Sequence, residues 1–261
     1  MPTITMDDGT RIHYEFEGAA DKPVLLFSNS LATDLHMWDD QMLAFSADHR
    51  ILRYDSRGHG QSDAPKGPYS IEILGRDVLA LLDALGLDTV DYCGLSKGGM
   101  VGMWLGTNAP QRFRKMVYSN TSAHMPTKQM WADRAAKVRA DGVASIGQQI
   151  VDRWFTPEFQ KTAPERVAKV AAMIDATPGE GYAACCEAIA EMDQSDSIRT
   201  ISLPVMVIAG ADDPSTPPDH AERIAGVIKG AKLVVLPKAA HLSNIEQTEL
   251  FNAALKDFLD A

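Results

Sequence analysis

Cysteine is rare in this chain, with three in 261 residues: Cys93, Cys185 and Cys186. The count is odd and two of the three are adjacent, so the sequence offers no convincing disulfide framework. Thiols in this pattern are typical of small buried apolar side chains in a reducing compartment. The spacing of cysteine and histidine does not suggest a zinc site either. We therefore expect neither disulfides nor a bound metal.

Long apolar runs and an excess of positive charge are also missing. No apolar run reaches the roughly 20 residues that cross a membrane, and the opening MPTITMDDGT lacks the basic and apolar regions of a signal peptide. Lys and Arg number 25 against 35 Asp and Glu, a net charge of −10. Such a chain repels nucleic acid and anionic lipid unless it carries a local basic patch. We expect a cytoplasmic protein that binds neither nucleic acid nor membrane.

The chain has the composition of an ordinary globular protein, 45% hydrophobic and 23% charged, and its length suits one domain with or without an insertion. Short apolar segments bounded by polar turns predict strands, and their near-continuous apolarity predicts burial on both faces. Longer helical patterns separate these segments, which is typical of parallel α/β architecture. The predicted strands are residues 24–27, 51–54, 90–93, 115–118, 205–208 and 232–236.

The chain divides into a core and an insertion. Residues 3–6 and 11–16 flank Asp8-Gly9 and predict an antiparallel hairpin at the start. Between about 122 and 200, strand patterns vanish and helix-forming residues dominate, so we expect several short helices that cap the sheet. The expected organisation is a helical cap over residues 122–200 and a core made of 1–121 and 201–261. The sequence leaves the oligomeric state open.

The strongest local motif is Gly94-Leu95-Ser96-Lys97-Gly98, which follows a predicted strand and opens a helical pattern. A G-x-S-x-G sequence in this setting predicts a sharp turn that lifts the serine hydroxyl out of the sheet. A β-carbon at Gly94 or Gly98 would collide with the neighbouring chain. We predict that Ser96 is a nucleophile and that the backbone N–H of Lys97 faces the oxyanion. The alternative is a glycine-rich turn with a solvated serine.

A serine nucleophile needs a base and a carboxylate, and candidates follow the last two predicted strands. His241 lies shortly after the last strand, where ligands bind in open α/β sheets. Its place in the chain order Ser, Asp, His favours a catalytic base over an ordinary solvated loop histidine. For the acid we predict Asp213, because its spacing from Gly210 and to Pro217 fits the usual acid turn. Asp212 stays the alternative.

A second oxyanion donor is expected in the loop after an early strand, at Asn29-Ser30-Leu31. Counting back from Trp38 assigns this role to the backbone N–H of Leu31. A backbone donor leaves no side-chain signature, so the alternative is a polar turn without function.

These motifs resemble those of the α/β-hydrolase family across essentially the whole chain. Residues 54–63, Tyr-Asp-Ser-Arg-Gly-His-Gly-Gln-Ser-Asp, match the family's Asp-x-Arg-Gly-x-Gly-x-Ser stretch, whose role we interpret as structural. The resemblance implies the α/β-hydrolase fold, a mostly parallel central sheet with helices on both faces and a helical cap insertion.

A narrower resemblance, to 3-oxoadipate enol-lactonases, rests on residues 27–38, on the elbow at 94–100 and on 240–247. Ala240 departs from the pattern, since glycine commonly precedes the histidine. The resemblance implies that Ser96 opens 3-oxoadipate enol-lactone to 3-oxoadipate, in the β-ketoadipate pathway of aromatic catabolism. It also implies a small-molecule lactone as the binding partner and no metal or organic cofactor. Direct attack by water is the less favoured mechanism.

The implied substrate carries a free carboxylate, and residues 128–139 supply cations that could bind it. This stretch holds four Lys and Arg against one Asp, a net charge of +3 up to Arg139. Trp131 and Arg134 are three residues apart, hence on one face of a helix. We predict that Arg134 binds the carboxylate through two hydrogen bonds and that Trp131 walls the lactone ring. The alternative is a solvated helix face with Trp131 in the core.

Other activities of the same architecture stay open. A general carboxylesterase, or a hydrolase of carbon–carbon bonds in ring-cleavage products, would use the same three residues. A small-molecule receptor of the same fold could retain them. Haloalkane dehalogenases and epoxide hydrolases are excluded, because both need aspartate where this chain has Ser96.

Overall fold

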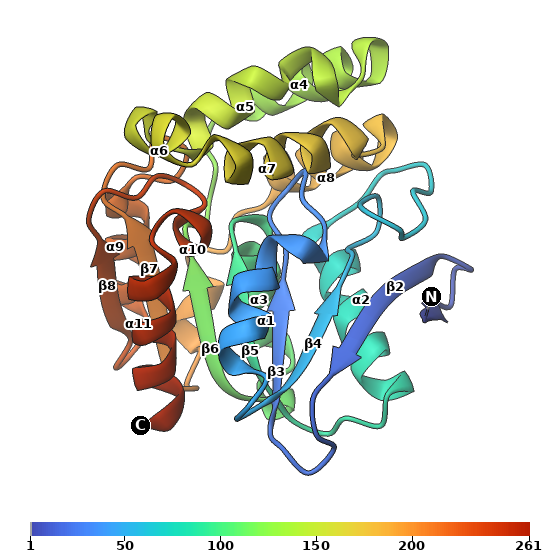
Figure 1. Ribbon diagram of the computed structural model, residues 1–261. Helices are drawn as coiled ribbons and strands as arrows, with labels where there is room; N and C mark the ends of the chain where they lie inside the picture. The colour runs from blue at the N-terminus through green and yellow to red at the C-terminus, as the bar shows by residue number, and fades with distance from the viewer. Residues whose placement is uncertain (1) are drawn as a thin grey trace.

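The computed structural model describes residues 2–261 and is built around one eight-stranded sheet (Figure 1). The apolar segments of the sequence form the middle and later strands, and the short opening segments form the first two. The strands are β1 (Thr3–Thr5), β2 (Arg11–Glu17), β3 (Val24–Ser28), β4 (Arg50–Tyr54), β5 (Val90–Leu95), β6 (Phe113–Ser119), β7 (Val205–Gly210) and β8 (Lys232–Leu236).

The order of strands across the sheet is β1-β2-β4-β3-β5-β6-β7-β8. β2 pairs antiparallel with β1 and with β4, and every other pair is parallel. The predicted hairpin and the predicted parallel strands are therefore confirmed. Because parallel strands end at one edge of a sheet, the residues that follow them gather at that edge.

Burial follows the position of each strand in the sheet. β3, β5 and β7 are buried along their whole length, as their apolarity predicted. In β8, by contrast, Lys232, Leu233 and Val235 are exposed. This strand is the last in the sheet and has a neighbour on one side only. The expectation that it is buried on both faces is therefore wrong.

Helices cover both faces of the sheet. α1 packs beside α11 on one face, and α2 packs beside α3 on the other (Figure 1). The core helices are α1 (Asp39–Phe45), α2 (Ile71–Ala84), α3 (Lys97–Asn108), α9 (Pro218–Val227), α10 (Ser243–Glu246) and α11 (Thr248–Asp260). Short 3-10 helices are η1 (Leu35–Trp38), η2 (Pro110–Arg112), η3 (Val143–Ile146) and η4 (Ser197–Thr200).

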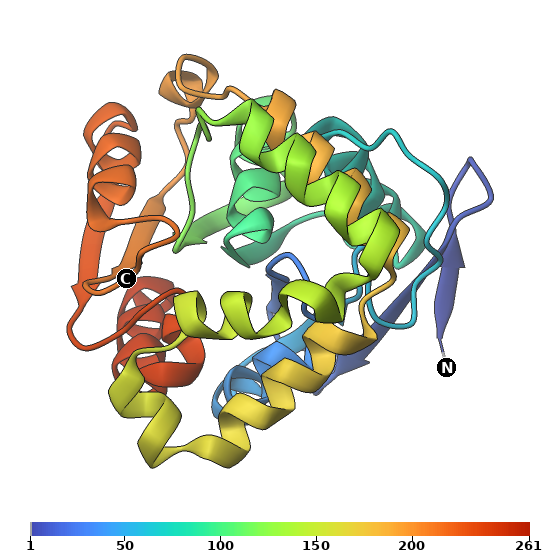
Figure 2. The same ribbon diagram turned by 90° about the horizontal axis from the view of Figure 1, so that it is seen from above.

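A further group of helices lies over the edge where the parallel strands end, as the view from above shows (Figure 2). α4 and α8 pack along each other within this group. All of these helices fall within residues 122–200, and we propose that they form the cap expected there. They are α4 (Lys128–Asp141), α5 (Gly147–Trp154), α6 (Pro157–Thr162), α7 (Pro164–Ala176) and α8 (Gly179–Glu191).

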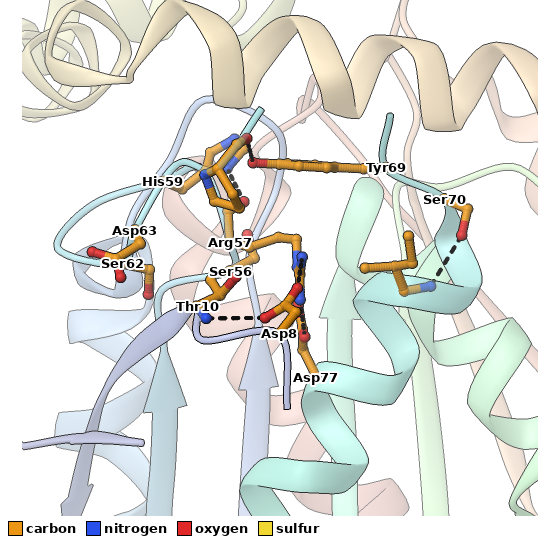
Figure 3. Close-up of polar contacts among 12 residues, drawn as sticks. Asp8, Thr10, Ser56, Arg57, His59, Ser62, Asp63, Tyr69, Ser70 and Asp77 are labelled. Carbon is orange, nitrogen blue, oxygen red and sulfur yellow. Dashed lines mark hydrogen bonds and ion pairs between the residues drawn. The ribbon is translucent and has the colours of Figure 1, made fainter. Parts of the chain in front are cut away.

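The loop after β4 packs between the core and the cap helix α8. Arg57 in this loop donates to Asp77 of α2 over 2.6 Å and to Asp8 of the first hairpin over 2.9 Å (Figure 3). The next residue, Gly58, lies directly against α8, since a β-carbon added to it would be 2.5 Å from the Cα of Gly181. These contacts agree with the structural role that we assigned to the motif at 54–63.

The three cysteines are free and buried. Cys93 lies in β5, whereas Cys185 and Cys186 lie side by side in α8. Burial raises the pKa of each thiol, because a thiolate loses its hydration in an apolar interior.

Candidate active site

Ser96 occupies the sharp turn between β5 and α3. Its φ of 56° lies in the left-handed region that side-chain-bearing residues rarely adopt. Its N–H donates to the carbonyl of Ser119 over 2.9 Å, and its carbonyl accepts from Thr121 Oγ1 over 2.7 Å and from the N–H of Met100 over 3.0 Å. The surrounding structure thus holds the backbone of Ser96 in a strained conformation on three sides.

The two outer glycines of the motif leave no room for a side chain. A β-carbon on Gly94 would lie 2.3 Å from the carbonyl oxygen of Gly98. One on Gly98 would lie 2.2 Å from the carbonyl oxygen of Ser28. Both separations are far below van der Waals contact, so the predicted steric need for glycine is confirmed.

Asp213 follows β7 and is buried beside His241. The Nδ1–H of His241 donates to Asp213 Oδ2 over 2.8 Å, and the same oxygen accepts from Thr216 Oγ1 over 2.8 Å and from Asn120 Nδ2 over 3.0 Å. Burial alone would raise the pKa of Asp213, but the charge of His241 and these hydrogen bonds outweigh it and lower the pKa to about 2. Asp212 is exposed. The geometry therefore joins Asp213, and not Asp212, to His241.

His241 follows β8, and its imidazole is buried between the core and the cap. The rings of Trp154 and His241 are 6.1 Å apart at an interplanar angle of 31°, and the N–H of Leu242 donates to the carbonyl of Trp154 over 3.2 Å. Both His241 and Ser96 line one cavity. Within the described residues no hydrogen bond joins Ser96 Oγ to the imidazole; such bonds often tighten only when substrate binds.

The two predicted oxyanion donors come from two segments, the loop after β3 and the elbow itself. Leu31 lines the same cavity as Ser96, and Lys97 is the first residue of α3. Neither backbone N–H donates a hydrogen bond to another group in the range 2–261. The first N–H groups of a helix favour a negative charge, so Lys97 has the placement that the motif requires.

The side chain of Lys97 was missed by sequence reasoning, which used only its backbone. Its Nζ donates to Ser56 Oγ over 2.5 Å and lies 3.4 Å from His59 Nδ1. The side chain is buried, and burial lowers the pKa of the amine. These contacts attach the start of α3 to the loop after β4. They therefore help to fix the direction in which the Lys97 N–H points.

A cavity of about 410 Å³ is lined by residues of both the core and the cap helices. Ser96 and His241 line it from the core, and Trp131 and Arg134 of α4 line it from above. The structure thus brings the two predicted substrate-binding residues into the same cavity as the predicted nucleophile and base. Trp131 is buried, so its alternative description as a packed side chain also holds. A cavity of this size suits a small organic molecule.

Sequence reasoning also missed two polar residues that connect the parts of the site. Asn120 follows β6, and its Nδ2 donates to Asp213 and to the carbonyl of Ala240 over 3.1 Å. Glu246 accepts from the N–H of Ala240 over 2.8 Å and from the N–H of Thr156 over 3.0 Å. The only signal for Asn120 was its place at the end of a strand. Glu246 ties the His241 loop to the chain between α5 and α6.

Among residues 2–261, no group of three or more His, Cys, Asp or Glu side chains is arranged so that it could hold a metal ion. In the same range, no helix is both long and apolar enough to cross a membrane.

The chain is similar to enol-lactonases and other hydrolases along almost its whole length. The chain is 43% identical over 254 residues to "3-oxoadipate enol-lactonase 2" of Acinetobacter baylyi, covering 97% of this chain and 94% of that protein. A solved hydrolase from Pseudomonas aeruginosa superposes with a TM-score of 0.97 at 42% identity, over 100% of this chain and 98% of the other. The enol-lactonase from Burkholderia xenovorans superposes with a TM-score of 0.97 at 38% identity, over the whole of both chains.

The family assignment rests on a match to a family as a whole. Residues 23–248 match the family described as alpha/beta hydrolase fold. This range contains the elbow at Ser96, the Asp213–His241 pair and all of the helices over the strand ends. The chain therefore belongs to the alpha/beta hydrolase family.

Proposed function

We propose that the protein is a serine hydrolase that opens 3-oxoadipate enol-lactone to 3-oxoadipate. The observation that carries the proposal is the buried 2.8 Å contact between Asp213 and His241, since His241 lines one cavity together with the strained Ser96. The relatives, which are named as enol-lactonases, indicate the substrate, and the site indicates the chemistry. The cytoplasmic location and the lack of nucleic-acid binding remain predictions from composition.

The first step forms an acyl-enzyme. Ser96 Oγ attacks the lactone carbonyl carbon, and His241 Nε2 takes its proton while Asp213 holds the Nδ1–H side of the ring. We assign the N–H groups of Leu31 and Lys97 to the oxyanion, because neither donates to another backbone group, Leu31 lines the cavity with Ser96, and Lys97 directly follows Ser96. The ring C–O bond then breaks. The leaving oxygen receives the proton from His241 and becomes an enol, which tautomerises to the ketone.

The second step frees the acyl group. His241 removes a proton from water, the hydroxide attacks the acyl carbon, and Ser96 Oγ leaves with the proton returned by His241. The lowered pKa of Asp213 keeps this carboxylate ionised throughout, so that it can stabilise the imidazolium in both steps.

The substrate contacts in this scheme are also proposals. Arg134 would bind the carboxylate of the substrate and Trp131 would wall its ring. Both line the cavity, and the guanidinium carbon of Arg134 lies 5.7 Å from the centre of the Trp131 ring.

Replacing Ser96 by Ala tests the mechanism. We expect kcat on the enol-lactone to fall by about 10⁴-fold or more, because the members of a triad act as a unit. Ser195→Ala is a matched control, since Ser195 is exposed and outside the cavity, and it should keep the full rate. Retention of more than a few per cent of the rate by Ser96→Ala would contradict the role of Ser96.

A rate comparison distinguishes the proposed lactonase from a general carboxylesterase. We expect kcat/KM of the wild type to be much higher on the enol-lactone than on p-nitrophenyl acetate. A clear preference for the acetate would remove the lactonase proposal and leave a serine esterase.

A further inference from the structure

The end of α5 contacts the loops that carry both the predicted acid and the predicted base. Arg153 donates to the carbonyl of Pro214, in the acid turn, over 2.5 Å. The carbonyl of Trp154 accepts from the N–H of Leu242 over 3.2 Å, and the Trp154 ring lies 6.1 Å from the ring of His241. One helix over the sheet thus contacts two loops of the core that are far apart in the sequence.

The helix that makes these contacts is itself firmly packed. Ile150 and Val151 of α5 are buried, and α5 packs against α7 and against η3. Side chains in such an interior have little freedom to move. The two loops of the core are therefore in contact with an ordered part of the cap helices.

The carboxylate of Glu246 forms a further link between the same two parts. Its Oε2 accepts from the N–H of Ala240, the residue before His241, over 2.8 Å. Its Oε1 accepts from the N–H of Thr156 over 3.0 Å and also from the hydroxyl of that residue. One oxygen therefore binds the base loop, and the other binds the chain between α5 and α6.

The charge of Glu246 depends on these hydrogen bonds. The residue is 8% exposed, and within residues 2–261 it makes no ion pair. Burying an ionised carboxylate is costly unless hydrogen bonds replace its hydration, and bonds to a charged acceptor are stronger than bonds to a neutral one. An apolar side chain could fill the same space, but it could not fix two backbone segments relative to each other.

We propose that Glu246 is a positioning residue for the catalytic base, which it holds by fixing the His241 loop against the end of α5. The imidazole is thereby placed relative to the cap helices as well as to the sheet. Arg153 and Trp154 also line the substrate cavity, so the base is positioned by the same helix that borders the substrate. This role goes beyond the proposed function and rests on it, since it needs His241 to act as the base.

Glu246→Gln is the direct test. The amide has the same shape but only one acceptor oxygen, so its NH₂ group must face the donor of Ala240 or those of Thr156, and one link is lost. We expect kcat to fall about 10–100-fold, because small displacements of a catalytic group are costly. KM should stay within about twofold, since the substrate contacts are unchanged. Glu249→Gln is the matched control, because Glu249 is exposed in α11 and outside the cavity, and it should keep the full rate.

The pH dependence of this effect reports the ionised carboxylate. Burial raises the pKa of Glu246, and the charge of Asp212 acts in the same direction, although the hydrogen bonds oppose them. Glu158 and Lys238 line a surface pocket together with Glu246. Once protonated, the carboxyl turns an O–H toward an N–H, as the amide does. The ratio of kcat between wild type and Glu246→Gln should therefore approach one as pH falls, whereas protonation of the imidazole slows both proteins alike. A constant ratio overturns the proposal.

Variants of Thr156 test the link from its other end. Thr156→Ala removes the hydroxyl and should lower kcat about threefold or more, whereas Thr156→Ser keeps the hydroxyl and should keep the rate. The hydroxyl also caps α6 by accepting from the N–H of Phe159 over 3.2 Å, so Tm falls in the alanine variant in any case and kcat is the deciding quantity. Unchanged kcat in both Glu246→Gln and Thr156→Ala, even with a lower Tm, would make the link purely structural and overturn the proposal.

Two readouts separate this role from the identity of the substrate. The low-field proton resonance of the His241 Nδ1–H, which reports the hydrogen bond to Asp213, should shift or broaden in Glu246→Gln and not in Glu249→Gln. The hydrolysis of p-nitrophenyl acetate should slow by the same factor as that of the enol-lactone, because both need the base. If the lactonase proposal fails, the wild type cleaves only the acetate, and a slower acetate rate in Glu246→Gln still supports the positioning role. An unchanged resonance together with an unchanged acetate rate overturns it.

Discussion

The carboxylate of Asp213 stays charged although it is buried. It is buried, which disfavours its charge, yet it accepts hydrogen bonds from three side chains and from the backbone N–H groups of Ser215 and Thr216. These contacts and the charge of His241 lower its pKa from 3.8 to about 2. Stability is therefore linked to the ionisation of this one residue.

The pH dependence of stability tests this linkage. A carboxyl whose pKa is lowered in the folded state stabilises the fold above its unfolded pKa and loses that contribution as pH falls through the folded pKa. Between pH 5 and pH 2 we expect Asp213 to lose about 2 kcal/mol of its contribution to the free energy of unfolding. Urea denaturation across this range, for wild type and Asp213→Asn, measures it. The gap between the two proteins should narrow by that amount, and a constant gap would contradict the lowered pKa.

The residues of the site differ in how far the sequence could identify them. Ser96 lies in a local motif, and Asp213 and His241 follow strands in a fixed chain order. These three residues can therefore be predicted from the sequence alone. The side chain of Lys97 could not be placed in this way, because its partners Ser56 and His59 are 41 and 38 residues away along the chain. Contacts between such distant segments exist only in the folded chain.

At the scale of elements, direct backbone contacts position the cap helices. α8 approaches the loop after β4 so closely that Gly58 and Gly181 face each other without side chains. The Arg57–Asp77 pair braces the same loop from the opposite side (Figure 3). The position of α8 is therefore fixed by contacts with the core, and not by the cap helices alone.

A single methyl group tests this anchor. Gly181→Ala should lower the free energy of unfolding by about 1–3 kcal/mol, because its β-carbon would meet the backbone of Gly58 and one of the two segments must move. Gly226→Ala is the matched control, since Gly226 is also helical but has nothing within 4 Å of the added carbon. That variant should gain up to about 1 kcal/mol from the higher helix propensity of alanine. Equal stability of the two variants in urea denaturation would rule out a tight contact at residue 181.

The elements themselves could largely be predicted from the sequence. Buried strands such as β7 carry an unbroken apolar pattern, and the loss of such patterns after residue 122 marks where the helices over the sheet begin. The exposure of β8 could not be predicted, because its apolar residues, among them Leu233 and Val235, are of the kind found in interior strands. Whether a strand lies at the edge depends on the order of strands, which no local pattern records.

At the scale of the whole molecule, the order of strands assembles the site. β5, β6, β7 and β8 are consecutive neighbours in the sheet, so Ser96, Asn120, Asp213 and His241 all emerge at the edge that the cap helices cover (Figure 1). Sequence reasoning predicted parallel strands and therefore one common edge. It could not give the separation of side chains along that edge, nor the way in which α4 and α8 enclose the cavity above it.

The three buried thiols can report the order in which parts of the protein unfold. Only an exposed, ionised thiol reacts with a disulfide reagent. Each cysteine is therefore unreactive until the element that contains it unfolds. Cys185 and Cys186 lie in α8, and Cys93 lies inside the sheet. If the helices over the strand ends detach before the sheet melts, mass spectrometry after brief labelling in mild urea should show a doubly modified species first. Simultaneous modification at all three would mean that the cap helices and the sheet unfold as one cooperative unit.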